Sequence, residues 1–438
     1  MIRQKIEART LRAGVIGLGY VGLPLAVAIA KAGFSVTGID TSSSKVVRIQ
    51  QGISYVPDVP SENVAPFVER GQIHATTDYR ALKDLDTVNI CVPTPLRKSK
   101  DPDMSFILSA VESAAQYLHK EQLIILESTT YPGTTEEVVL PKLESTGLKV
   151  GRDFFLAFSP ERIDPGNKIY TTVNTPKIVG GITPACTRIA QRFYEEFINE
   201  VHPVSSTRTA EMVKLLENTF RSVNIGLVNE MALMCDRMNL DVWEIVDAAA
   251  TKPFGFMPFY PGPGLGGHCL PVDPLHLSWK AKTYEFYARF IELASEINSS
   301  MPEYVLDKVI NALNRQRKAV NGSKILIIGV AYKKDVGDIR ESPAIDLVRL
   351  LNGRGGEILY HDPYVSEFHV GSTGDNLPDR YVSQELTVEL ISQVDCVAIM
   401  TDHSSINYDW LVECADVVVD SRNATKSVDN HRDKIIKI

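Results

Sequence analysis

The loop Pro261–Pro274, PGPGLGGHCLPVDP, holds a cysteine in a setting that suits nucleophilic chemistry. Its glycines and prolines argue against a helix or a central strand and predict a tightly folded loop. Cys269 follows His268, and Asp273 lies four residues further on. A thiolate in such a loop can attack a carbonyl carbon while backbone N–H groups surround the reacting atoms. Two other uses of this cysteine stay open: a small buried hydrophobe, or half of a metal site together with the histidine.

A lysine and an asparagine, Lys214 and Asn218, form a second candidate for chemistry. The segment Thr209–Asn239 carries apolar residues at helical spacing and predicts one long helix. Residues four apart share a helix face, so this ammonium and this amide can polarise one hydroxyl together. The alternative is an exposed pair on a solvated helix. From about Leu275 to Gln316 the chain is again predicted to be helical.

Residues 13–40, AGVIGLGYVGLPLAVAIAKAGFSVTGID, predict a strand, a glycine turn, a helix and a second strand. The turn has the pattern G-x-G-x-x-G, which allows a tight turn, close approach to a pyrophosphate and close packing of helix on strand. Asp40 ends the second strand, where a carboxylate binds ribose hydroxyls and repels a 2′-phosphate. The pattern therefore predicts NAD as the cofactor. The turn residues expected to contact NAD are Gly17, Leu18, Gly19, Tyr20, Val21 and Gly22.

Further predicted strands at 73–76, 87–92, 123–127 and 154–157 continue the same sheet. Residues that follow the carboxyl ends of parallel strands face the ligand crevice. Four polar residues have such positions: Thr94, Thr129, Glu161 and Asp164. The threonines also suit ordinary turns or helix caps, and the two acids also suit a solvated charged loop.

The last third of the chain repeats this organisation. Residues 323–330 (SKILIIGV) predict a strand that enters a turn, and a strand at Glu357–Tyr360 closes the unit. The turn lacks G-x-G-x-x-G, so we expect this domain to hold a different anion. Lys333, Arg340 and Arg422 are candidate clamps on phosphates, although surface cations are common in any protein.

The sequence as a whole predicts an α/β protein with two doubly wound, Rossmann-like parallel-sheet domains joined by a central long-helix region. The expected domains are 1–205 for NAD, 206–316 for the helical connector with the cysteine loop, and 317–438 for the second nucleotide. The apolar text of the central helices predicts a homodimer or a higher homo-oligomer.

Composition excludes several classes of protein. The 438 residues carry a net charge of −8 without a dense Lys/Arg tract, which argues against nucleic-acid and membrane partners. The six cysteines lack the spacing of a disulfide framework, the N-terminus lacks an apolar signal core, and no 18 apolar residues run together. We therefore expect a soluble cytoplasmic protein.

Together these motifs resemble the UDP-glucose/GDP-mannose dehydrogenase family, the nucleotide-sugar 6-dehydrogenases. The resemblance covers essentially the whole chain. Beside the glycine turn with Asp40, it rests on EST at 127–129, SPER at 159–162, EMVKLLENTFR at 211–221, GGHCLPVDP at 266–274 and AYKKDVGDIRESPA at 331–344. The chain is most similar to the UDP-N-acetylglucosamine 6-dehydrogenase branch. One departure is Pro165, where glucose enzymes of the family carry a second glutamate, and this departure counts against glucose as the sugar.

The resemblance implies an NAD-dependent four-electron oxidation of a sugar C6 hydroxyl, with no metal. Cys269, expected to be buried, would capture the aldehyde as a thiohemiacetal and later carry a thioester. Lys214 and Asn218 would stabilise the oxyanion, Asp273 would act with Lys214 on a water, Glu161 would be the base for thioester hydrolysis, and Thr129 would support the water or the cofactor. Thr94, Thr129 and Arg340 are further expected NAD contacts. The expected contacts to the UDP-sugar are Glu161, Arg162, Lys214, Asn218, Arg221, Tyr260, Gly266, Lys333 and Arg422.

Within the resembled family, UDP-glucose, UDP-N-acetylmannosamine and UDP-N-acetylgalactosamine remain alternative substrates. Two rival functions outside the family also remain open on the sequence. The first is a two-electron hydroxy-acid dehydrogenase, in which Cys269 is a bystander. The second is an NAD-sensing module without turnover.

Overall fold

A computed structural model describes residues 2–97, 99–164, 166–167, 169–370 and 380–438. The chain divides into two compact units. The first unit comprises Met1–Glu217 and Leu275–Phe286, and the second comprises Asn218–Pro274 and Tyr287–Ile438. The three-domain division expected from the sequence stays a prediction.

The first unit is built on an eight-stranded sheet with the strand order β3-β2-β1-β4-β5-β6-β7-β8. All neighbouring strands are parallel except β6 and β7, which run antiparallel. The strand order reverses beside β1, and this is the point at which a doubly wound sheet opens a ligand crevice at the carboxyl ends of its strands. The strands are β1 (Arg12–Ile16), β2 (Ser35–Ile39), β3 (Ile73–Thr76), β4 (Thr87–Ile90), β5 (Leu123–Leu126), β6 (Phe155–Phe158), β7 (Lys177–Gly181) and β8 (Val201–Pro203).

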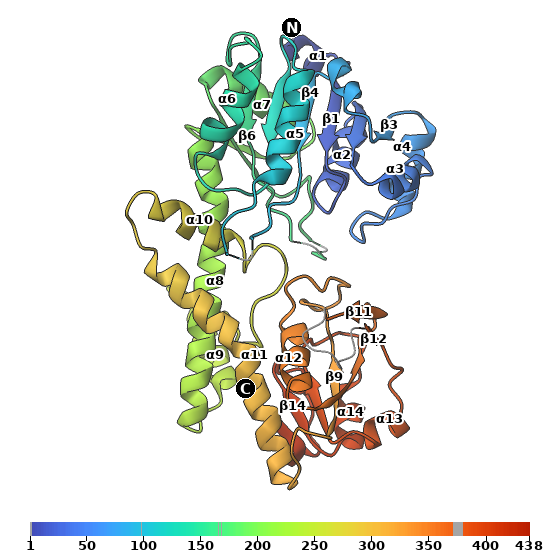
Figure 1. Ribbon diagram of the computed structural model, residues 1–438, viewed down its shortest axis with the longest axis vertical. Coiled ribbons are helices and arrows are strands. Elements are labelled where there is room, and N and C mark those ends of the chain that lie inside the picture. The colour runs from blue at the N-terminus through green and yellow to red at the C-terminus, as the bar shows by residue number, and fades with distance from the viewer. Residues whose placement is uncertain (1, 98, 165, 168, 371–379) are drawn as a thin grey trace. The chain divides into compact units, whose positions relative to one another are not determined.

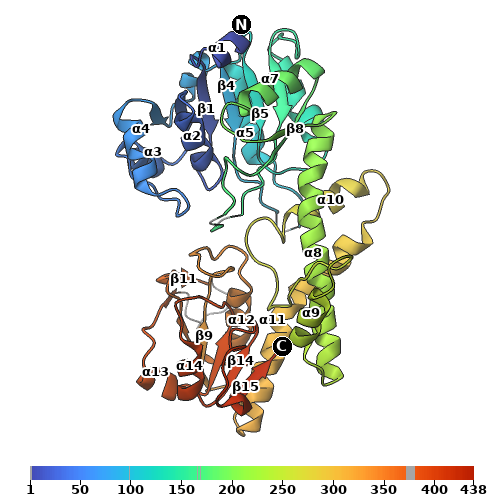
Figure 2. The ribbon, with the colours of Figure 1, turned by 180° about the vertical axis from the view of Figure 1, so that it is seen from behind.

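Helices cover both faces of this sheet (Figure 1 and Figure 2). Successive strand residues enter opposite cores: Val15 packs with the helices α2 and α7, and Ile16 packs with α5 and α6. Burial on both faces explains why these strands are apolar throughout instead of alternating. The helices are α1 (Ile2–Glu7), α2 (Gly22–Lys31), α3 (Ser43–Gln50), α4 (Ala65–Glu69), α5 (Ser105–Gln116), α6 (Leu140–Glu144) and α7 (Pro184–Tyr194).

The predicted long helix is α8 (Thr207–Arg237), and the division between the two units falls within it, after Glu217. The helical structure predicted from about Leu275 to Gln316 is confirmed, with one interruption. Two helices, α10 (Asp273–Lys282) and α11 (Arg289–Arg315), occupy this segment, because the chain turns at Glu285, whose φ is 57°. A short helix, α9 (Val242–Ala250), begins with Asp241 as its side-chain cap.

The second unit holds a five-stranded parallel sheet with the order β10-β9-β13-β14-β15. Its two faces are packed by separate apolar cores. The predicted Rossmann-like α/β fold is therefore confirmed. The strands are β9 (Lys324–Ile328), β10 (Glu357–His361), β13 (Cys396–Ile399), β14 (Val418–Asp420) and β15 (Ile435–Lys437); the hairpin is β11 (Glu367–His369) with β12 (Arg380–Val382); the helices are α12 (Pro343–Asn352), α13 (Val388–Ser392) and α14 (Tyr408–Cys414).

In the part of the chain that the structure describes, no helix is both long and apolar enough to span a membrane.

Candidate active site

The glycine turn of the first unit fits a dinucleotide. Gly17 has a φ of +92°, and a Cβ atom there would lie 2.4 Å from the carbonyl oxygen of Cys91. A Cβ atom on Gly22 would lie 1.8 Å from the carbonyl oxygen of Gly17, whereas one on Gly19 would meet nothing within 4 Å. Helix α2 begins after Val21, whose side chain makes no capping hydrogen bond to the first helical N–H groups. The turn therefore offers open space and helical N–H groups to a pyrophosphate.

Asp40 is tied to this turn. Its Oδ2 atom accepts a hydrogen bond from the Leu18 N–H at 2.9 Å, and its Oδ1 atom accepts one from the Ser42 N–H at 2.9 Å. The Oδ2 atom also accepts the Lys45 ammonium at 3.3 Å, whereas Oδ1 keeps one acceptor site for a ribose hydroxyl. The Tyr55 hydroxyl donates to the Leu18 carbonyl at 2.6 Å. The backbone N–H and the carbonyl of Leu18 are therefore both held by side chains. Tyr55 lies outside the glycine motif, and no signal in the sequence predicted its contact with Leu18.

The loop after β5, which carries Thr129, is anchored on α8. The backbone N–H groups of Gly133 and Thr135 donate to the carboxylate of Glu211 at 2.6 and 2.8 Å, and the Thr135 hydroxyl adds a third bond at 2.7 Å. Burial raises the pKa of Glu211 to about 7, against the opposing effect of these donors. Glu211 lies one turn before Lys214 on the helix, so this contact aligns two segments that carry predicted site residues.

Glu161 follows β6 and belongs to a buried ion cluster. Lys177, the first residue of β7, contacts Glu127 at 2.6 Å and Glu161 at 3.2 Å. Burial disfavours the charged form of Glu161, but the Lys177 ammonium and the N–H groups of Ile163 and Arg162 outweigh it. The pKa of Glu161 therefore lies below its ordinary value. Sequence reasoning missed Lys177, because strand β7 itself was not predicted.

The other predicted residues of this unit are placed as follows. Thr94 is buried and Thr129 is half-buried, and they follow β4 and β5. The Arg162 guanidinium donates to Glu217 at 2.6 and 3.3 Å and to the Pro176 carbonyl at 2.6 Å, so it anchors its own loop. Pro165, the departure from the family pattern, lies outside the described residues.

In the second unit, the cysteine loop is packed against the turn that follows β9. Gly267 has a φ of +80° and donates its N–H to the Arg340 carbonyl at 2.8 Å. A Cβ atom on Gly266 would lie 2.6 Å from the Tyr332 Cβ atom, so only glycine fits without a shift. Burial, with the charge of Arg340, lowers the pKa of His268. The expectation that Cys269 is buried is wrong: it is exposed, in the turn that precedes α10.

The start of α10 brings two predicted catalytic residues together. The Asp273 N–H donates to the Cys269 carbonyl at 2.8 Å, and the Asp273 carboxylate accepts a hydrogen bond from the Asn218 amide at 2.5 Å. Asn218 and Asp273 are both buried. Lys214 is also buried, one helical turn before Asn218 on α8. Among the residues that the structure describes, no three His, Cys, Asp or Glu side chains gather where they could hold a metal ion.

A cavity of about 610 Å³ opens in the second unit beyond the carboxyl ends of β9, β13 and β14. Tyr260 lines it, stacks on Trp243 with ring centroids 6.0 Å apart, and donates its hydroxyl to Asp247 at 2.7 Å. Arg422 also lines the cavity, and burial lowers the pKa of its guanidinium. Lys334 also lines the cavity. The sequence had instead predicted its half-buried neighbour Lys333 as a phosphate contact.

Asp362 shows why this unit cannot repeat the chemistry of Asp40. It ends the corresponding second strand, but its Oδ2 atom accepts the N–H groups of Val330 and Ala331 and lies 3.1 Å from Nε2 of His403. The Asp362 carboxylate is buried and already accepts hydrogen bonds from within the protein, so it does not face a ribose hydroxyl.

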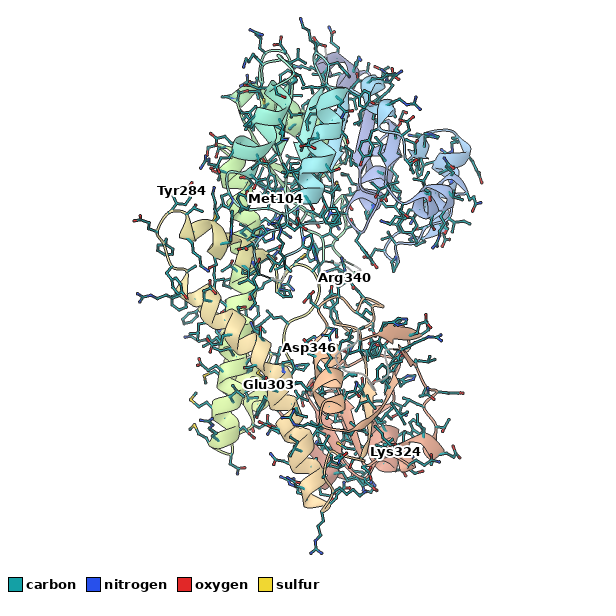
Figure 3. All side chains as sticks on the ribbon, viewed as in Figure 1. Met104, Tyr284, Glu303, Lys324, Arg340 and Asp346 are labelled. Atoms are coloured by element: carbon teal, nitrogen blue, oxygen red, sulfur yellow. The ribbon has the colours of Figure 1, made fainter. Side chains whose placement is uncertain are left out.

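Arg340 and Arg221 have positions that leave their predicted roles open. Arg340 (Figure 3) lies in the loop between β9 and α12 and forms a bidentate pair with Asp338, with its closest contact at 2.6 Å. Arg221 is exposed on α8. Their contacts with cofactor and substrate, like the other assigned contacts, stay predictions.

The glycine turn, Asp40 and a second nucleotide-type sheet define the chain as an NAD-dependent dehydrogenase with an additional nucleotide-binding domain. Residues 11–198 match the NAD binding domain of the UDP-glucose/GDP-mannose dehydrogenase family, residues 208–300 match its central domain, and residues 326–427 match its UDP binding domain. The chain belongs to this family. The predicted family, enzyme class and NAD cofactor are thereby confirmed.

Known relatives differ in the sugar they are named for. The chain is 36% identical over 360 residues to the UDP-N-acetyl-D-glucosamine 6-dehydrogenase of Pseudomonas aeruginosa, which covers 82% of this chain and 84% of that protein. It is 35% identical over 414 residues to the NDP-N-acetyl-D-galactosaminuronic acid dehydrogenase of Ralstonia nicotianae, covering 91% and 92%. The solved structure of a UDP-D-ManNAc dehydrogenase from Pyrococcus horikoshii has a TM-score of 0.88 at 32% identity, covering 98% and 99%.

Proposed function

We propose that this enzyme oxidises the C6 hydroxyl of a UDP-N-acetylhexosamine to the carboxylate, with UDP-N-acetylglucosamine as the preferred substrate, to supply a surface polysaccharide precursor. The observation that carries the proposal is the Asn218–Asp273 pair at the start of α10, directly after the Cys269 loop. A Pseudomonas relative named for UDP-N-acetyl-D-glucosamine supports this sugar. The N-acetylmannosamine and N-acetylgalactosamine epimers are the alternatives, because other relatives carry those names.

Each residue has a separate task in this proposal. NAD, when bound at the glycine turn, accepts hydride in each of the two oxidation steps. The Cys269 thiolate attacks the aldehyde carbon and forms the C–S bond, and its exposure suits this task. The Lys214 ammonium and the Asn218 amide stabilise the oxyanion, and Asp273 acts on a water with Lys214. Glu161 takes a proton from the water that cleaves the thioester.

The cavity beside Tyr260 and Arg422 is the proposed place for the UDP group. A nucleoside diphosphate needs an aromatic surface and cations, and the cavity offers Tyr260 stacked on Trp243 together with Arg422 and Lys334. Lys333 and Gly266 remain proposed contacts to the UDP-sugar, and Arg340 remains a proposed contact to NAD.

The proposed assembly is a homodimer formed through the helical segment. Large apolar side chains are exposed along α8 and α11 at spacings that place them on one helix face, which is the pattern of a face that packs on another helix. They are Phe220, Leu227 and Met234, seven residues apart on α8, and Phe290 and Leu293, three residues apart on α11. Light scattering on the purified full-length chain tests this assembly, and a monomer at micromolar concentration would contradict it.

The decisive experiment measures NADH against product for a panel of UDP-sugars and hydroxy acids. Two NADH per uronate are expected with a UDP-N-acetylhexosamine. One NADH with released aldehyde or with a hydroxy acid would support the two-electron rival, and NAD binding without turnover would support a sensor. Cys269→Ala is expected to lose activity, while Cys414→Ala, a half-buried cysteine, is the matched control. A fully active Cys269→Ala enzyme would overturn the covalent route.

A further inference from the structure

The ion cluster around Lys177 contains two carboxylates and one ammonium group. The Lys177 ammonium is buried between two carboxylates, at 2.6 Å from Glu127 and 3.2 Å from Glu161. The Oε1 atom of Glu127 is filled from other elements, because it accepts hydrogen bonds from the Asn89 amide at 2.6 Å and from the Tyr194 hydroxyl at 2.7 Å. Its Oε2 atom accepts the Lys177 ammonium. One buried pair between Glu127 and Lys177 would satisfy the interior. A second buried carboxylate beside one cation is costly unless it serves a purpose.

The second carboxylate belongs to a loop and not to the sheet. Glu161 follows β6, and its side chain is 12% exposed, compared with 4% for Lys177 and 0% for Glu127. Lys177 therefore connects a fully enclosed acid to one at the edge of the cluster. An ammonium has three N–H donors, so it can serve both acids at the same time.

The contacts also define the direction of the Glu161 carboxylate. Its Oε1 atom accepts the backbone N–H groups of Arg162 at 2.7 Å and Ile163 at 2.9 Å. Its Oε2 atom accepts the Lys177 ammonium at 3.2 Å. A carboxylate has about four acceptor sites, so one site on Oε2 remains for a water molecule.

We propose that Lys177 is a positioning residue for thioester hydrolysis. Anchored on Glu127, it holds the Glu161 carboxylate so that the remaining acceptor site on Oε2 receives the hydrolytic water. In this step the water oxygen bonds to the thioester carbon, Oε2 takes the water proton, the C–S bond breaks and the thiolate of Cys269 leaves. No electrons are exchanged with a cofactor. The inference rests on the base role of Glu161 in the proposed function.

The test separates hydrolysis from oxidation in the full-length enzyme. Enzyme is mixed with NAD and UDP-N-acetylglucosamine, or with the epimer that the substrate panel selects, and NADH is followed from the first turnover. Intact-protein mass spectrometry of quenched samples detects sugar bound to Cys269. In Lys177→Met we expect the initial burst of NADH to persist, kcat to fall roughly 10- to 100-fold with KM falling in proportion so that kcat/KM is unchanged, and the adduct to accumulate. Lys177→Arg should restore part of the rate.

Two further variants separate a specific effect of Lys177→Met from a general effect of losing a lysine or of failing to fold. Lys142→Met removes an exposed lysine that pairs with Glu112 in the same unit, and it should behave as wild type. If Lys177→Met does not fold, the double variant Lys177→Met with Glu127→Gln keeps the net charge of the cluster and should accumulate the same adduct.

The outcomes distinguish this inference from the function on which it rests. Adduct in Glu161→Gln but none in Lys177→Met or the double variant, with hydrolysis at the wild-type rate, would overturn the positioning role alone. No adduct in Glu161→Gln would overturn the base role itself, and the positioning role with it.

Discussion

Glu211 makes the folding stability of the first unit depend on pH. Burial is the largest influence on this carboxyl and raises its pKa from 4.5 to about 7. A pKa shift of this size contributes about 3 kcal/mol to the free energy of unfolding. Because the folded state favours the neutral acid, this stability is fully present below the ordinary pKa and is lost as the pH rises through about 7. The substitution Glu211→Gln keeps the shape of the side chain and removes its titration.

Calorimetric melting of the wild type and Glu211→Gln at pH 5 and pH 8 measures this effect. For a unit of roughly 230 residues, 1 kcal/mol shifts the melting temperature by about 2–4 °C. The difference between the two proteins should therefore change by roughly 6–12 °C between these pH values, in favour of the variant at pH 8. Glu112→Gln, at an exposed ion pair, should show no such change. A difference in melting temperature between wild type and Glu211→Gln that is the same at pH 5 and pH 8 would refute the reasoning.

Substitutions in the dinucleotide turn should separate binding from folding. Asp40→Ala is expected to weaken NAD binding by about 1–3 kcal/mol, or roughly 5- to 150-fold in Kd. It should also reduce the preference of the enzyme for NAD over NADP, because Lys45 then lacks its partner at 3.3 Å. An unchanged Kd for NAD in a fluorescence titration would contradict this. Gly22→Ala should lower the melting temperature and abolish NAD binding, because its Cβ would lie 1.8 Å from the Gly17 carbonyl oxygen. Gly19→Ala, whose Cβ meets no protein atom within 4 Å, should melt like wild type yet bind NAD more weakly, and a destabilised Gly19→Ala protein would argue against an open turn.

Local features of the sequence determined the outline of this protein. The glycine turn and Asp40 lie within one strand–helix–strand unit, and the structure places Leu18 against Asp40 as such a unit requires. Strand β3 was predicted with its observed bounds, because the alternation of apolar and polar residues in Ile73–Thr76 is a local signal. Helix α8 was predicted to within two residues at each end for the same reason.

Predictions that depended on distant contacts were less successful. The segment from about Leu275 to Gln316 was predicted to be helical, but the turn at Glu285 was not predicted, because a positive φ at this residue has no strong local signal. Strand β7 was missed although Lys177–Gly181 is buried throughout, because a five-residue apolar run with two glycines has weak strand propensity.

The sequence by itself determined the family, the cofactor and the residue types available for chemistry. The tertiary structure decided which side chains meet. Lys177 lies 50 residues from Glu127, and Asn218 lies 55 residues from Asp273, yet each pair is in hydrogen-bond contact. Such contacts follow from strand order, from the register of β5, β6 and β7, and from the turn that starts α10. No local pattern encodes them, because the free energy that places these side chains comes from the packing of the whole sheet and its helices.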